Sequence, residues 1–118
     1  MTTARTNGSG LRFNVYGNGE PILLLHGLFQ SGSHWTERGY TPALRDRYSV
    51  VEVDLPGHGG SARCSAAADF DLQRQVAQLI DVLDDLGAHK TIVWGYSLGA
   101  WLASGLAAGA KERVTVTL

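Results

Sequence analysis

Apolar residues fall in two kinds of run along this chain, and each kind predicts a different kind of β-strand. Mostly apolar, β-branched runs occupy residues 22–25, 50–54 and 91–94, a pattern typical of strands covered on both faces in a parallel sheet. Residues 11–16 and 114–118 instead alternate apolar with polar side chains, which favours strands with one face toward solvent.

Helices are predicted between these strands. Residues 71–86 form the clearest one, with Asp69 or Asp71 as its N-cap and one apolar face. That face consists of Val76, Leu79, Ile80, Leu83 and Leu86. A second helix is expected over residues 98–110, where small side chains allow close packing on a sheet. A third, over residues 34–46, is interrupted by a glycine and a proline.

Strands that alternate with helices favour right-handed βαβ units, so the predicted fold class is α/β, with a mainly parallel sheet and helices on both faces. No internal repeat, low-complexity segment or linker divides the chain. We expect one domain over residues 11–118. Residues 1–10 are mostly Thr, Ser, Gly and Asn, and they are predicted to be a flexible polar tail.

Composition and charge narrow the possible partners. The 118 residues are 44% hydrophobic and 18% charged, with a net charge of −1, which is typical of a soluble globular domain. The chain has neither a basic stripe nor an apolar run long enough to span a bilayer, so we expect no nucleic-acid or membrane partner. It lacks the apolar core of a signal peptide and has Cys64 as its single cysteine, which favours the cytoplasm.

The sequence Gly95-Tyr96-Ser97-Leu98-Gly99 lies between a predicted strand and a predicted helix. This is the sequence form of a nucleophile elbow, in which a strained turn presents a serine hydroxyl at the carboxyl end of a strand. Gly95 and Gly99 flank the serine at positions −2 and +2, because a side chain there would clash in so sharp a turn. We therefore predict that Ser97 is a catalytic nucleophile.

A second loop is predicted to face this serine. His26 and Gly27 follow a buried run, and the glycine lets the backbone turn so that the next N–H group points toward Ser97. The backbone N–H groups of Leu28 and Leu98 are then expected to form an oxyanion hole.

The histidines and Asp54 are assigned structural roles. His26 is expected to pack and hydrogen-bond within its own loop. Asp54 precedes a Pro-Gly turn, where an aspartate commonly accepts turn N–H groups, and His58 lies between two glycines of that turn. His34 and His89 are expected in loops or on the surface. No spacing of histidine and cysteine predicts a metal site, and no glycine-rich phosphate-binding motif occurs, so no cofactor is expected.

Together these motifs resemble the α/β-hydrolase superfamily, in its lipase, esterase and haloperoxidase branch, over residues 11–118. The resemblance rests on residues 22–27 for the oxyanion strand, Trp35 in the next helix, the loop at 53–61 and the elbow at 95–99. It implies that Ser97 is the nucleophile and that the N–H groups of Leu28 and Leu98 are the oxyanion donors. Serine rather than aspartate at the elbow argues against the haloalkane dehalogenase and epoxide hydrolase branches. The sequences around His58 and Ser97 are also similar to those of the menaquinone-pathway synthase that eliminates pyruvate.

The chain departs from the family pattern after the elbow. The triad order in this fold is Ser, then Asp or Glu, then His, but the residues after Ser97 include Glu112 and no Asp or His. The triad acid and base are therefore unknown, and the chain is interpreted as an N-terminal portion of the fold that stops after about the sixth family strand. Residues 114–118 are then expected to form an exposed edge that favours self-association.

The leading hypothesis is a serine hydrolase that acts on an ester or similar acyl bond of a small molecule. Little turnover is expected from this chain alone, because triad members are missing. One alternative is a non-catalytic remnant or binding module that uses the open pocket or the exposed edge strand. Within the enzyme class, a lyase or synthase of the menaquinone-pathway type is a further alternative.

Overall fold

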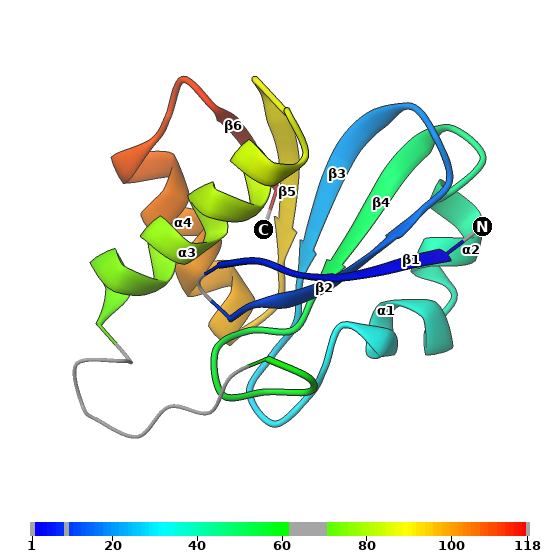
Figure 1. Cartoon of the computed structure of the whole chain (residues 1–118), viewed down its shortest axis with the longest axis horizontal. Helices are drawn as coiled ribbons and strands as arrows, with labels where there is room; N and C mark the ends of the chain where they lie inside the picture. Colours follow the sequence, from blue (N-terminus) through cyan, green and yellow to red (C-terminus); the bar gives the residue numbers. More distant parts are fainter. Residues whose placement is uncertain (1, 9, 62–70, 118) are drawn as a thin grey trace.

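The computed structural model describes residues 2–8, 10–61 and 71–117, and a single β-sheet forms its centre (Figure 1). The strands are Thr2–Thr6 (β1), Arg12–Tyr16 (β2), Glu20–Leu25 (β3), Tyr48–Val53 (β4), Thr91–Gly95 (β5) and Val114–Thr117 (β6). They lie in the order β1-β2-β4-β3-β5-β6. The four strands from β4 to β6 in this order pair in parallel, whereas β1 and β2 run antiparallel to their neighbours.

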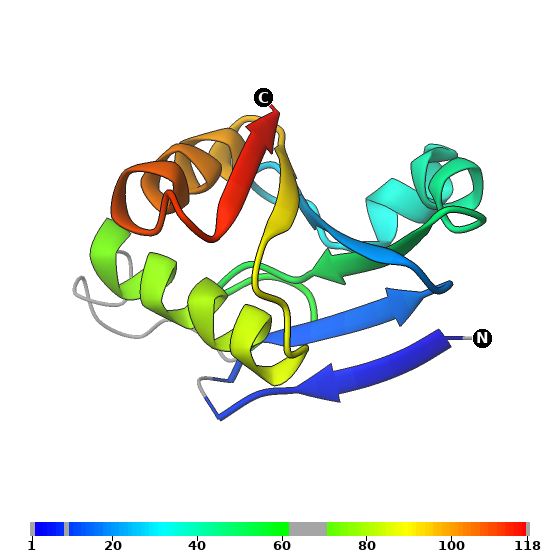
Figure 2. The same ribbon diagram turned by 90° about the horizontal axis from the view of Figure 1, so that it is seen from above.

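Helices cover both faces of the sheet, as the sequence predicts. They are Ser33–Glu37 (α1), Tyr40–Leu44 (α2), Leu72–Asp85 (α3) and Leu98–Gly109 (α4). Figure 2 shows α3 and α4 on one face, with α1 and α2 on the other. In the described part of the chain, no helix is both long and apolar enough to cross a membrane. The helices on both faces of this mainly parallel sheet confirm the predicted α/β class.

The continuous apolar runs are buried from both sides. In β3, Leu23 and Leu25 join the larger core cluster with α3 and α4, while Ile22 and Leu24 join a smaller cluster beside α1 and α2. All four side chains are at most 1% exposed, and burial of each contributes roughly 1.5–3 kcal/mol to stability. Packing on both faces fixes the central strands, so their carboxyl ends present loops at one edge of the sheet.

The predicted helix boundaries hold closely for α3. Asp71 is its N-cap, and the Asp71 carboxylate accepts a hydrogen bond from the Arg74 N–H. The expected apolar face packs into the larger cluster. The alternative cap, Asp69, and the single cysteine, Cys64, lie outside the described residues.

The segment predicted as one interrupted helix forms two short ones. Gly39 separates α1 from α2 with a φ of 89°, a left-handed conformation that glycine adopts without a steric penalty. The proline lies inside the first turn of α2, where its missing N–H costs nothing. The break therefore falls at the glycine.

The prediction of a flexible polar tail is wrong for residues 2–6. These residues form β1, which pairs antiparallel with β2, so that Thr3 lies opposite Val15 and Arg5 opposite Phe13. Threonine is branched at Cβ and is well suited to a strand, although its polarity conceals the strand pattern. β1 covers the edge that β2 would otherwise expose.

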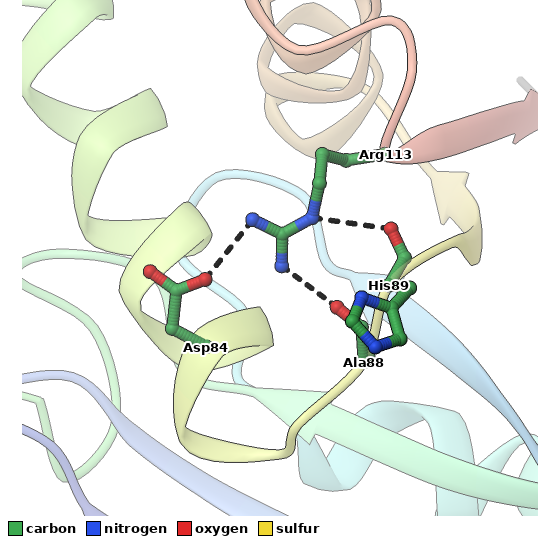
Figure 3. A network of polar contacts seen from close by, with 4 residues as sticks. All are labelled: Asp84, Ala88, His89 and Arg113. Atoms are coloured by element: carbon green, nitrogen blue, oxygen red, sulfur yellow. Dashed lines mark hydrogen bonds and ion pairs between the residues drawn. The ribbon is translucent and has the colours of Figure 1, made fainter.

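Arg113 fixes the start of β6 to the end of α3 (Figure 3). Its guanidinium donates hydrogen bonds to the carbonyls of Ala88 and His89 at 2.7 and 3.1 Å, and to the Asp84 carboxylate at 3.0 Å. Asp84 is exposed, so the ion pair itself contributes little. The bonds to the carbonyls hold the loop that leads into β5, the strand that carries the elbow.

Candidate active site

β5 ends at Gly95, α4 begins at Leu98, and the turn between them carries Ser97. Ser97 has φ 55° and ψ −114°, a backbone conformation that costs a non-glycine residue about 1–3 kcal/mol. Its side chain is exposed. The structure thus places a strained, accessible hydroxyl between a parallel strand and the N-terminus of a helix, the arrangement predicted from the sequence.

Glycines are sterically required on both sides of this turn. A Cβ on Gly95 would lie 2.4 Å from the Gly99 carbonyl oxygen, and a Cβ on Gly99 would lie 2.1 Å from the Leu25 carbonyl oxygen. At Gly27, a Cβ would lie 3.0 Å from the Tyr96 ring. The elbow, α4 and the loop after β3 therefore approach one another at backbone distance.

The two predicted oxyanion donors are unoccupied by other groups. Leu98 is the first residue of α4, where backbone N–H groups have no partner within the helix and the helix dipole favours an anion. Leu28 lies in a turn that Gln30 closes. The Gln30 backbone N–H donates to the Gly27 carbonyl, and the Gln30 side-chain Oε1 accepts the Gly27 N–H. Within the described residues, neither the Leu28 nor the Leu98 N–H donates a hydrogen bond.

His26 is a satisfied interior residue, as predicted. It is 1% exposed, its Nδ1 lies 2.7 Å from the Gly27 carbonyl oxygen, and its Nε2 accepts the Leu55 N–H at 3.0 Å. Burial lowers the pKa of His26, and the neighbouring charge of His58 lowers it further, against the Gly27 hydrogen bond that raises it. Both ring nitrogens are engaged with backbone, so this imidazole is not placed to act as a general base.

His58 is also bound to backbone through both nitrogens. Its Nδ1 lies 3.0 Å from the Pro56 carbonyl oxygen, and its Nε2 accepts the Phe29 N–H at 3.1 Å. The ring centroids of His26 and His58 are 5.1 Å apart. Sequence reasoning placed each histidine in its own loop and missed this pairing, which joins residues far apart in the chain.

Asp54 organises the turn after β4, as predicted. Its Oδ1 accepts the Gly32 N–H at 2.8 Å and its Oδ2 accepts the Gly60 N–H at 2.9 Å. One carboxylate thus ties the start of α1 to the loop that carries His58. Among the described residues, no group of three or more His, Cys, Asp or Glu side chains could hold a metal ion.

A cavity of about 420 Å³ lies beside the elbow, on the side of α1 and α2. It is lined by His26, Gln30, His34, Trp35, Arg38, Tyr40, Trp94, Gly95 and Tyr96. Three of the aromatic rings meet edge to face, at centroid distances of 5.3 Å for Trp35 with Tyr40 and 6.4 Å for Tyr40 with Trp94. Its size and aromatic walls suit a small organic group.

Comparison with known proteins identifies the family. The family model described as "Alpha/beta hydrolase family" matches residues 22–118, and the chain belongs to that family. The resemblance inferred from the elbow and the oxyanion loop is therefore confirmed.

Individual relatives differ in their activities. Epoxide hydrolase A of Mycobacterium tuberculosis is 37% identical over 97 residues, which cover 78% of this chain and 30% of the relative. A pimeloyl-[acyl-carrier protein] methyl ester esterase of Nitrosomonas europaea is 32% identical over 106 residues, which cover 90% and 38%. The solved structure of epoxide hydrolase CorEH without ligand superposes with a TM-score of 0.87 at 27% identity, covering 97% of this chain and 40% of the other. The chain thus spans well under half the length of these relatives.

Proposed function

We propose that this protein is a serine-nucleophile hydrolase that acts on an ester or similar acyl bond. The observation that carries the proposal is the strained backbone of Ser97 between Gly95 and Gly99, with an exposed side chain at the end of β5. The Ser97 hydroxyl attacks the carbonyl carbon, and the oxygen that becomes negative accepts the N–H groups of Leu28 and Leu98. The alcohol leaves, and water then hydrolyses the acyl-serine.

The identity of the nucleophile favours acyl chemistry over epoxide opening, although some similar proteins are named epoxide hydrolases. A serine oxygen that opened an epoxide would form an alkyl ether, which water does not hydrolyse at a carbonyl carbon. A serine that attacks an ester forms an acyl-enzyme. The same oxyanion hole stabilises the negative oxygen that forms when water attacks this acyl-enzyme. The similarity to a methyl ester esterase supports the same choice.

The cavity beside the elbow supports a small-molecule substrate. Its aromatic walls favour an apolar or aromatic group next to the scissile bond, while Arg38 on the same lining favours a negatively charged substituent. Gly95 and Tyr96 belong to both the elbow and the cavity wall, so a group held there lies next to Ser97.

A general base is still required, and neither His26 nor His58 supplies it, because both imidazoles are bound to backbone on each nitrogen. We therefore expect this chain alone to retain only the acceleration that an oxyanion hole and binding give, roughly 10³–10⁴-fold over water. Detection of the nucleophile thus needs a reagent that captures serine covalently.

The second candidate is a binding module without catalysis, and the open cavity with its aromatic walls is the observation that favours it. A lyase or synthase of the menaquinone-pathway type would use the same serine and oxyanion donors. Covalent reactivity of Ser97 distinguishes the binding module from both kinds of enzyme, the hydrolase and the lyase or synthase. Product analysis then distinguishes hydrolysis from elimination.

The test is fluorophosphonate labelling of the purified chain, with the modified peptide identified by mass spectrometry. We expect an adduct on Ser97 that disappears in Ser97→Ala. Ser104→Ala is the matched control, because Ser104 is an exposed serine of α4 whose hydroxyl donates to the Ala100 carbonyl. Labelling that persists in Ser97→Ala, or no labelling of a folded chain at millimolar probe, would overturn the proposal in favour of the binding module.

A further inference from the structure

His26 and His58 form a reciprocal pair between two loops. Each Nδ1 faces a carbonyl oxygen of its own loop, Gly27 for His26 and Pro56 for His58. Each Nε2 faces a backbone N–H of the opposite loop, and the rings lie against each other with centroids 5.1 Å apart. Two crossed hydrogen bonds therefore join the loop after β3 to the loop after β4.

These partners fix the chemical state of both rings. A carbonyl oxygen can only accept a hydrogen bond, so each Nδ1 must carry the proton. A backbone N–H can only donate, so each Nε2 must be free of one. Both histidines are therefore neutral, with the proton on Nδ1, whenever the two loops are joined as in this structure.

The loop that His58 holds carries one of the predicted oxyanion donors. Phe29 has a φ of 62°, a left-handed conformation that strains a residue with a side chain. Its side chain is 90% exposed, so side-chain packing does not hold it there. Two hydrogen bonds between Gln30 and Gly27 close this turn, and the bond from the Phe29 N–H to His58 Nε2 ties it to the loop after β4. Leu28 is the residue directly before Phe29.

We propose that His58 is a positioning residue that holds the Leu28–Phe29 turn in the geometry of an oxyanion hole, and that protonation of His58 releases it. An imidazolium has N–H groups at both nitrogens, so protonated His58 would face the Phe29 N–H with a second donor. The Phe29 N–H would then lose its acceptor, and the turn, left with its own Gln30–Gly27 bonds, would hold the Leu28 N–H less firmly in direction. The inference rests on the proposed function in one respect, because it takes the Leu28 N–H as an oxyanion donor.

Charges around the pair set its response to pH. His34 from α1 and Asp54 from the loop after β4 lie near the pair, and Arg12 from β2 packs on Gly60 in the same turn as His58. The Asp54 carboxylate favours protonation of His26, whereas His58 and His34 disfavour it. Burial of His26 further disfavours a second positive charge beside a protonated His58.

The test compares His58→Leu and His58→Gln with wild type between pH 5 and 8. Glutamine places an amide oxygen near the position of His Nε2, so it can accept the Phe29 N–H at every pH, whereas leucine cannot accept it at any. His89→Gln is the matched control, because His89 is exposed and its side chain lies outside both loops. The two readouts are the backbone amide resonances of Leu28 and Phe29 and the rate of fluorophosphonate capture of Ser97.

In wild type we expect the Phe29 amide resonance to titrate together with the His58 ring, and the ring nitrogens to show the Nδ1–H form at pH 8. In His58→Gln the amide should not titrate. In His58→Leu the two amides should shift at every pH while the rest of the spectrum is retained. Capture of Ser97 should slow by about tenfold or more in His58→Leu, up to the 10²–10³-fold loss known for removal of an oxyanion donor, and His58→Gln should restore it.

The two proposals fail in different ways. A Phe29 amide that is unchanged in His58→Leu, or that titrates equally in His58→Gln, overturns the positioning role. Equal capture rates in all variants at every pH also overturn it, yet leave the serine hydrolase intact. The expected amide behaviour without any capture of Ser97 supports the positioning role and contradicts the proposed function.

Discussion

Glu52 is a buried carboxyl group whose ionisation links the stability of the protein to pH. It is 1% exposed, and its Oε2 accepts the hydroxyls of both Thr36 in α1 and Thr41 in α2. Its Oε1 has no partner among the described residues. Burial raises the pKa of Glu52 above its ordinary value of 4.5, against the two threonine hydrogen bonds that lower it.

The substitution Glu52→Gln is predicted to stabilise the protein increasingly as pH rises. Because the folded state holds the Glu52 proton more tightly than the unfolded state does, the wild-type free energy of unfolding falls as pH rises above 4.5. Glutamine keeps an oxygen acceptor for the threonines and does not ionise. Urea unfolding between pH 4 and 8 should show the variant gaining stability relative to wild type as pH rises. Exposed Glu112→Gln should show no such trend, and a constant difference for Glu52→Gln would contradict the prediction.

At the scale of elements, α4 lies close to β3. A Cβ on Gly99 would lie 2.1 Å from the Leu25 carbonyl oxygen and 2.8 Å from the His26 carbonyl oxygen. Both obstacles are backbone atoms of a central strand and the residue after it, so they cannot move aside as a flexible side chain can. The absence of a side chain at Gly99 therefore lets the N-terminus of α4, and with it the Leu98 N–H, lie close to the loop after β3.

Gly99→Ala is predicted to push α4 away from the sheet and to lower the free energy of unfolding by about 1–3 kcal/mol or more. Gly109→Ala is the control in the same helix, because the nearest neighbour of its added Cβ is a Val76 methyl at 3.8 Å. Urea denaturation followed by tryptophan fluorescence compares the two. Equal stability of the two variants would show that the close approach can relax without cost.

Elements with strong hydrophobic patterns could be predicted from the sequence, and those built on polar residues could not. A continuous run of apolar side chains predicts the buried strand β3, and the helical spacing of apolar side chains predicts the amphipathic face of α3. β1 is mainly threonine, and only its pairing with β2 reveals it. The pairing of His26 with His58 was not predictable either, because it depends on two parallel strands ending side by side and on hydrogen bonds to backbone. The available signal was a histidine next to glycine after each of two buried runs.

At the scale of the whole molecule, the sheet has two outer edges. β1 and β6 are the outer strands, and β6 pairs only with β5 within the described residues. Because β6 has a strand partner on one side only within these residues, its other backbone edge can pair with another strand, and Thr115 is exposed. The net charge of −1 provides little repulsion between copies.

The chain is therefore predicted to associate through β6, and Thr115→Lys should oppose this because a lysine on an edge strand disfavours pairing with a second strand. Light scattering after size exclusion should give masses above the monomer value of 12.6 kDa that rise with concentration in wild type and fall toward it in the variant. Ala108→Lys adds the same charge on an exposed position of α4 and should leave association unchanged. Equal effects of the two lysines would mean that repulsion between whole molecules, and not the edge of β6, governs association, and a wild-type monomer at every concentration would refute the association itself.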